Sequence, residues 1–109
     1  GTRMVAGIPV VRPEHLIPLK ARAYLDLRRQ RERGSKVDKA DILKHRNDIL
    51  RLYRIVDPTY SATEPGAVRH DMEDFLVTLE SDPPDLPSLG IREVTLETFM
   101  SHLRNRYCP

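Results

Sequence analysis

The stretch EHLIPLKARAYLDL, residues 14–27, predicts an amphipathic helix and contains one lysine that does not fit the pattern. Residues that lie three, four or seven positions from Lys20 share its side of a helix. At those positions the sequence has Leu16, Ala23, Tyr24 and Leu27. The ammonium group of Lys20 is therefore expected in the middle of the apolar stripe, where an unpaired cation is costly. For this reason Lys20 is the first candidate functional residue.

This stretch belongs to the first of two predicted neighbouring helices. Pro18 suits the first turn of a helix, so the first helix is expected from about Pro18 to Arg33, before Gly34. Asp38 is a good N-cap for a second helix that runs to about Val56. Because the connection between them is short, we expect the two helices to pack antiparallel.

Two further helices are expected in the second half, over about residues 67–80 and after the N-cap Thr95. Their apolar stripes comprise Val68, Met72, Phe75, Leu76 and Leu79, and Leu96, Phe99, Met100, Leu103 and Tyr107. The Pro-rich residues 81–90 between them predict a stiff, irregular connector. The segment MVAGIPVV, residues 4–11, predicts a single short strand at an edge, because it contains Pro9.

The predicted fold class is therefore mainly α, with about four helices packed as a small bundle and one short N-terminal β-strand. We expect a single helical domain over residues 1–109, in which residues 1–12 form a strand or linker. No apolar run approaches the roughly 20 residues of a membrane span, and no signal-peptide pattern is present. The expected location is cytoplasmic, with no membrane partner. The single Cys108 excludes an internal disulfide and is interpreted as a tail thiol without a catalytic role.

The net charge of +2 hides an uneven distribution. Residues 20–54 contain twelve Lys and Arg against five Asp and Glu, a net charge of +7. Residues 55–109 contain four against ten, a net charge of −6. This polarity indicates either a basic face for phosphates or two halves that complement each other within one domain.

The antiparallel helices predict a specific meeting point. Asp48 lies at the edge of the apolar arc of the second helix, so it can share one wall with Lys20. Without a function, the same arrangement is a partly buried ion pair, or a lysine whose stem covers apolar surface. Periodicity leaves both interpretations open.

The pair LIPLKARAYLDL and DILKHRNDILRLYRI resembles the C-terminal half of the AbiEii-type nucleotidyltransferases, a bacterial toxin and phage-defence family. There, a lysine in a KxxA-like pattern precedes an aspartate in an R/K-x-x-x-D-like pattern on the next helix. Here these patterns are residues 20–23, KARA, and residues 44–48, KHRND. The resemblance covers about residues 5–56.

The resemblance implies that Lys20 and Asp48 are catalytic, and that Arg22, Lys44 and Arg46 are candidate phosphate-binding residues. In nucleotidyl transfer, charge develops on phosphate oxygens as pyrophosphate leaves a nucleoside triphosphate, and a fixed cation stabilises it. A carboxylate can align that cation or the attacking hydroxyl. The resemblance also implies Mg²⁺ and a nucleoside triphosphate as cofactors of the full-length protein, and Asp41 is a second candidate for the functional carboxylate.

The acidic pair that holds magnesium in this family is absent, because no GS-x-D-x-D-like stretch occurs and Gly34-Ser35 is followed by Lys36. We therefore expect the C-terminal part of a larger nucleotidyltransferase, inactive alone, whose partner is a missing N-terminal core. A cognate antitoxin and an RNA acceptor are further expected partners. A homodimer through the N-terminal strand is expected because Val5, Ile8, Val10 and Val11 lack an obvious partner strand.

Three other interpretations remain open. Asp41, His45 and Asp48 share one helix face at a spacing that could present metal ligands, although no ligand cluster on a second helix accompanies them and no metal site is expected. A helix-turn-helix over residues 34–48 lacks a short upstream helix. The main alternative function is a non-catalytic helical adapter that binds RNA or a protein partner through the basic Lys20–Arg54 region.

Overall fold

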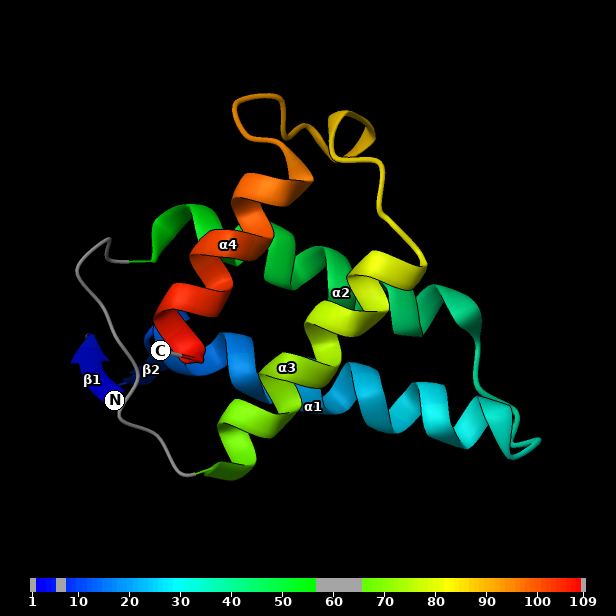
Figure 1. Ribbon diagram of the computed structural model, residues 1–109. Helices are drawn as coiled ribbons and strands as arrows, with labels where there is room; N and C mark the ends of the chain where they lie inside the picture. The colour runs from blue at the N-terminus through cyan, green and yellow to red at the C-terminus, as the bar shows by residue number, and fades with distance from the viewer. Residues whose placement is uncertain (1, 6–7, 57–65, 109) are drawn as a thin grey trace. The chain divides into compact units, whose positions relative to one another are not determined.

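The computed structural model describes residues 2–5, 8–56 and 66–108, with side chains from residue 12 onward. This part of the chain is mainly helical, and it contains four α-helices, as the sequence predicts. The chain divides into two compact units, Gly1–Pro58 and Thr59–Pro109 (Figure 1). The single domain over residues 1–109 stays a prediction.

Helix α1 spans Pro13–Glu32 and begins five residues before the predicted start at Pro18. Pro13 occupies the first turn, where a proline needs no hydrogen-bond partner, and the amides of His15 and Leu16 close that turn on the Arg12 carbonyl. Pro18 lies inside the helix, where it removes one backbone hydrogen bond. The earlier start places Ile17 in the core with no exposed surface, and this burial offsets the lost bond.

The buried stripe of α1 differs from the predicted one by a small rotation. Its buried apolar residues are Ile17, Ala21, Tyr24 and Leu25. The expected members Leu16, Ala23 and Leu27 are only half-buried. Lys20 therefore lies at the border of the core and not at its centre, which lowers the cost of its charge.

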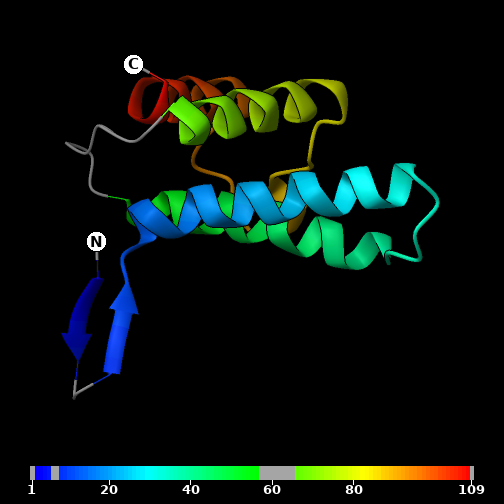
Figure 2. The same ribbon diagram turned by 90° about the horizontal axis from the view of Figure 1, so that it is seen from below.

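Helix α2 spans Lys39–Leu52 and is followed by the 3₁₀ turn η1, Tyr53–Ile55. The predicted N-cap is confirmed, because the carboxylate of Asp38 accepts a hydrogen bond from the Ala40 amide at 2.9 Å. Ile42, Ile49, Leu50 and Val56 are buried. Figure 2 shows α1 and α2 side by side and antiparallel, as the short connection predicts.

At the N-terminus, β1 (Thr2–Val5) and β2 (Ile8–Val11) pair antiparallel, with Val5 opposite Ile8. The single strand predicted over residues 4–11 is not shown. The expectation that this segment lacks a partner strand does not hold either, because β1 and β2 pair with each other. The homodimer that rested on this expectation stays a prediction, since the side chains of these residues lie outside the description.

The second unit contains α3 (Gly66–Ser81), the 3₁₀ turn η2 (Pro87–Leu89) and α4 (Leu96–Tyr107). The predicted cap of α4 is confirmed, because the Thr95 hydroxyl accepts a hydrogen bond from the Thr98 amide at 3.2 Å. The predicted stripes form buried faces: Met72, Phe75, Leu76 and Leu79 on α3, and Phe99, Met100, Leu103 and Tyr107 on α4. Val68 and Leu96 are only half-buried.

The connector between α3 and α4 contains the 3₁₀ turn η2, although its prolines predict a stiff, irregular segment. The amide of Ile91 bonds back to the Leu86 carbonyl at 3.0 Å around η2, and both side chains are buried. Gly90 closes the turn at a φ of 80°, a conformation that favours glycine. Among the helices that the structure describes, none has the length and apolar character that crossing a membrane would require.

Candidate functional site

The candidate site is an ion pair between the two helices of the first unit. The ammonium Nζ of Lys20 donates to the carboxylate Oδ2 of Asp48 at 3.0 Å. The two side chains are 26% and 28% exposed, so solvent and a ligand can reach both. The geometric prediction that these residues share one wall is confirmed.

The local fold explains why they meet. Lys20 lies in the first half of α1 and Asp48 in the last turns of α2. Antiparallel packing brings the beginning of one helix to the end of the other, as Figure 2 shows for α1 and α2. Ile17 lies three residues before Lys20 on α1, and Ile49 directly follows Asp48 on α2. Both side chains are fully buried. The core beneath the pair therefore holds the two backbones in place, while the charged groups stay at the rim.

Among the predicted phosphate-binding residues, only Lys44 lies in helical register with Asp48. Lys44 is exposed and precedes Asp48 by four residues, so the two share one side of α2. Arg22 is exposed, and its spacing of two from Lys20 directs it to another side of α1. Arg46 is half-buried and donates from Nε and Nη2 to the Asn47 Oδ1 at 3.2 and 3.1 Å. The structure thus joins neither arginine to the pair within the residues that it describes.

The alternative carboxylate and the metal interpretation can also be placed. Asp41 is exposed, whereas Asp48 is the carboxylate that reaches Lys20. His45 is half-buried, and its Nδ1 is buried without a hydrogen-bond partner in the described part of the chain. No group of three His, Cys, Asp or Glu side chains that could hold a metal ion occurs among the described residues. Asp41, His45 and Asp48 therefore do not form a metal centre there.

The thiol of Cys108 lies in the second unit and contacts the Arg69 carbonyl at 3.8 Å. Burial raises the pKa of this thiol, and the Glu73 carboxylate raises it further, against the opposing effect of Arg69 and Arg104. A raised pKa keeps the thiol protonated near neutral pH, which is the unreactive form.

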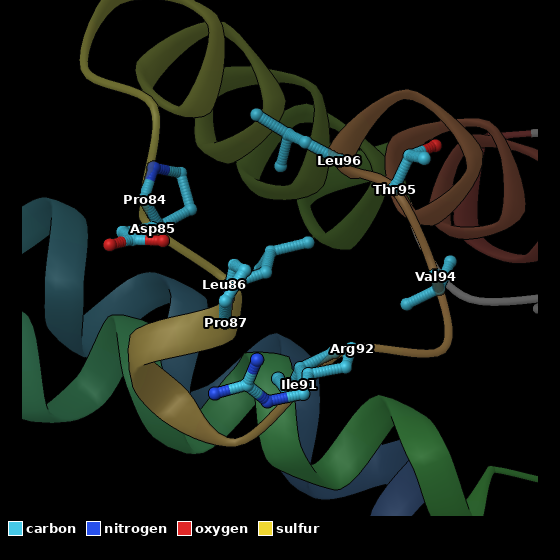
Figure 3. Close-up of a pocket in the computed structure, with 9 residues that line it drawn as sticks. All are labelled: Pro84, Asp85, Leu86, Pro87, Ile91, Arg92, Val94, Thr95 and Leu96. Atoms are coloured by element: carbon cyan, nitrogen blue, oxygen red, sulfur yellow. The ribbon is translucent and has the colours of Figure 1, made fainter.

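The second unit also contains an open pocket of about 530 Å³ that the sequence did not indicate. It is lined by the connector and the start of α4, as Figure 3 shows: Pro84, Asp85, Leu86, Pro87, Ile91, Arg92, Val94, Thr95 and Leu96. Its lining combines apolar side chains with one acidic and one basic residue, Asp85 and Arg92. The only sequence signal was a pair of apolar residues, Leu86 and Ile91, within a proline-rich stretch.

Comparison of the chain with family models, with curated proteins and with solved structures finds no match. The resemblance to AbiEii-type nucleotidyltransferases therefore stays a hypothesis, and the functional argument depends on the Lys20–Asp48 geometry.

Proposed function

We propose that the first unit is the helical part of a nucleotidyltransferase-like protein, in which Lys20 and Asp48 act on a nucleoside triphosphate. The observation that supports the proposal is the ion pair itself. Two residues on different helices, singled out by their place in a sequence pattern, meet at 3.0 Å at a surface that a ligand can reach.

In the proposed reaction, the acceptor oxygen forms a bond to the α-phosphorus while the bond from that phosphorus to the bridging oxygen breaks. Pyrophosphate leaves, and the acceptor proton passes to solvent or to a base. Lys20 stabilises the charge on the phosphate oxygens, because a fixed cation needs little reorganisation as that charge develops. Asp48 holds the ammonium in position before the substrate binds, and it aligns the cation or the attacking hydroxyl afterwards.

The proposed protein needs Mg²⁺ and a nucleotide-binding core in addition to this unit. Among the described residues no cluster of carboxylates fits Mg²⁺, so the proposal assigns the ion to that nucleotide-binding core and not to Asp48. Lys44 is the third member of the proposed site, because it lies one helical turn from Asp48 on the same side.

The proposal can be tested on this chain by nuclear magnetic resonance. Addition of ATP, GTP, CTP, UTP or inorganic triphosphate should shift the signals of Lys20, Lys44 and Asp48. The variant Lys20→Ala should lose these shifts at Lys44 and Asp48, whereas the control Arg104→Ala, which removes an exposed cation of the second unit, should retain them. A non-catalytic adapter with a structural ion pair predicts no triphosphate response at these residues, and that result would contradict the proposal.

A second test concerns the transfer reaction. If the reading frame upstream of Gly1 encodes a Gly-Ser turn followed by an acidic pair, the longer protein should transfer nucleotide from a labelled triphosphate. Lys20→Ala should then abolish transfer while the protein remains folded. A Lys20→Ala variant that unfolds at a much lower temperature, yet transfers at the normal rate when folded, would make Lys20 a structural residue only.

A further inference from the structure

The end of the helical hairpin opposite the Lys20–Asp48 pair is strongly basic. Figure 2 shows the turn between α1 and α2 at this end. Between residues 29 and 39 the chain has five cations and two acids, a net charge of +3. All five cations are exposed, and we call them the basic tip: Arg29, Arg31, Arg33, Lys36 and Lys39.

The basic tip is poorly neutralised by its own acids. Arg29 pairs with Asp26 at 3.4 Å, but both side chains are about half exposed, at 47% and 51%. The Asp38 carboxylate is engaged by the Ala40 amide as the cap of α2. Within the described part of the chain, Arg33, Lys36 and Lys39 are joined to no carboxylate.

Helix stabilisation explains only part of this charge. Cations in and just after the last turn of α1 interact favourably with the negative end of the helix dipole, which accounts for Arg29, Arg31 and the C-cap residue Arg33. Lys39, however, is the first residue of α2, where the positive end of the dipole opposes a cation. Lys36 lies in the loop and contributes to neither helix. Both lysines therefore carry charge that the hairpin itself does not need.

The backbone of the tip is well defined by hydrogen bonds. Gly34 adopts a φ of 91°, and its amide bonds to the Arg31 carbonyl at 3.1 Å. The Ser35 amide reaches the Gln30 carbonyl at 3.0 Å, and the Arg31 guanidinium donates to the Val37 carbonyl at 2.7 Å. The cations are thus presented from a fixed turn, which reduces the entropy lost when a ligand orders them.

We propose that the basic tip is a docking surface for nucleic acid, bound through its phosphodiester backbone without sequence preference. Such binding needs exposed cations and no base-reading groups. A protein partner is disfavoured, because protein interfaces have an aromatic or apolar centre, and because lysine, unlike arginine, is depleted there. The tip presents two lysines and no exposed apolar side chain, since Val37 is half-buried.

This surface is distinct from the candidate site. Arg29, the cation of the tip that is nearest to Lys20 on α1, lies nine positions from it, which corresponds to roughly 14 Å of helix. The inference goes beyond the proposed function, because nucleic-acid docking at the tip requires no transfer chemistry at Lys20.

The test is binding of a labelled 20-nucleotide single-stranded RNA to the full chain, measured by fluorescence anisotropy. If about four phosphates are contacted, the affinity should fall roughly 50-fold between 50 and 200 mM salt. The variant Arg33→Gln/Lys36→Gln/Lys39→Gln should weaken binding at least 10-fold. Its circular dichroism should be unchanged, because none of the three side chains makes a hydrogen bond or ion pair in the described structure that the substitution would break.

A matched control removes the same net charge from the second unit. The variant Arg69→Gln/Arg92→Gln/Arg104→Gln also neutralises three exposed cations and should bind RNA within 2-fold of the unaltered chain. Equal weakening by both variants would assign binding to net charge and overturn the tip as the site. Poly-glutamate of similar length and phosphatidylserine vesicles should bind at least 10-fold more weakly than RNA. If either bound as tightly as RNA, the nucleic-acid proposal would fail.

Discussion

Lys20 and Asp48 are separated by 28 positions in the sequence, and their charged groups lie 3.0 Å apart across the α1–α2 interface. Each side chain keeps about a quarter of its surface exposed, at 26% and 28%. In its degree of burial, the pair therefore lies between two kinds of ion pair. A surface pair contributes little to stability, whereas the loss of one partner of a buried pair is costly. This intermediate position is suited to a pair that can open for a ligand.

A double-mutant cycle with Lys20→Ala and Asp48→Ala should give a coupling free energy of about 1 kcal/mol. The partial burial reduces screening by water, which is the reason to expect more than at a fully exposed pair. The control is Arg69–Glu73, a pair at 3.0 Å on α3 whose side chains are 52% and 51% exposed. Its coupling should be about 0.3–0.5 kcal/mol. Urea unfolding measures both cycles, and equal values would show that the burial of Lys20–Asp48 has no energetic effect.

Removal of either confirmed helix cap should destabilise only the unit that contains it. Asp38→Ala and Thr95→Ala each remove the acceptor of one backbone amide, and each should destabilise its helix by about 1 kcal/mol. Amide hydrogen exchange is the measurement, because it reports each helix separately. Asp38→Ala should increase exchange in α1 and α2, and Thr95→Ala should increase it in α3 and α4. Equal loss of protection throughout the chain would mean that the two units unfold as one cooperative body.

Gly34 should tolerate a side chain poorly although space is available for one. A Cβ atom at Gly34 would meet nothing within 4 Å, but its φ of 91° is unfavourable for any other residue type. Gly34→Ala should therefore cost about 1 kcal/mol, entirely from backbone strain. Gly66→Ala is the matched control, since Gly66 also has open space and no such φ. Thermal unfolding should show a lower midpoint only for Gly34→Ala, and identical midpoints would be inconsistent with the left-handed turn.

The Cys108 thiol should react slowly at neutral pH. Because the folded state raises its pKa, alkylation by iodoacetamide should reach half its maximal rate at a higher pH in the native chain than in urea. The stabilising effect of the protonated thiol is fully present below the unfolded pKa of about 8.5 and is lost as pH rises through the higher folded value. Glu73→Gln should bring the native profile closer to that in urea. A native profile at or below the denatured one would contradict the burial of this thiol.

The sequence by itself determined the helices and their caps, since both depend on local residue patterns. Asp38 and Thr95 are side chains that satisfy free amides within their own turn, and the stripes of α3 and α4 follow helical spacing. The meeting of Lys20 and Asp48 was also predictable, because a short connection leaves two helices few ways to pack.

Tertiary structure decided what local rules leave open. The start of α1 at Pro13 depends on the burial of Ile17, which outweighs the local preference for Pro18 in a first turn. The position of Lys20 at the border of the core depends on the rotation of α1, because a periodic pattern defines an apolar face only to within a residue or so. The burial of Leu86 and Ile91 in a proline-rich connector could not be read from periodicity, since an irregular segment has none. Packing adds the distant contacts that local patterns do not encode, and for that reason it alone decided these three features.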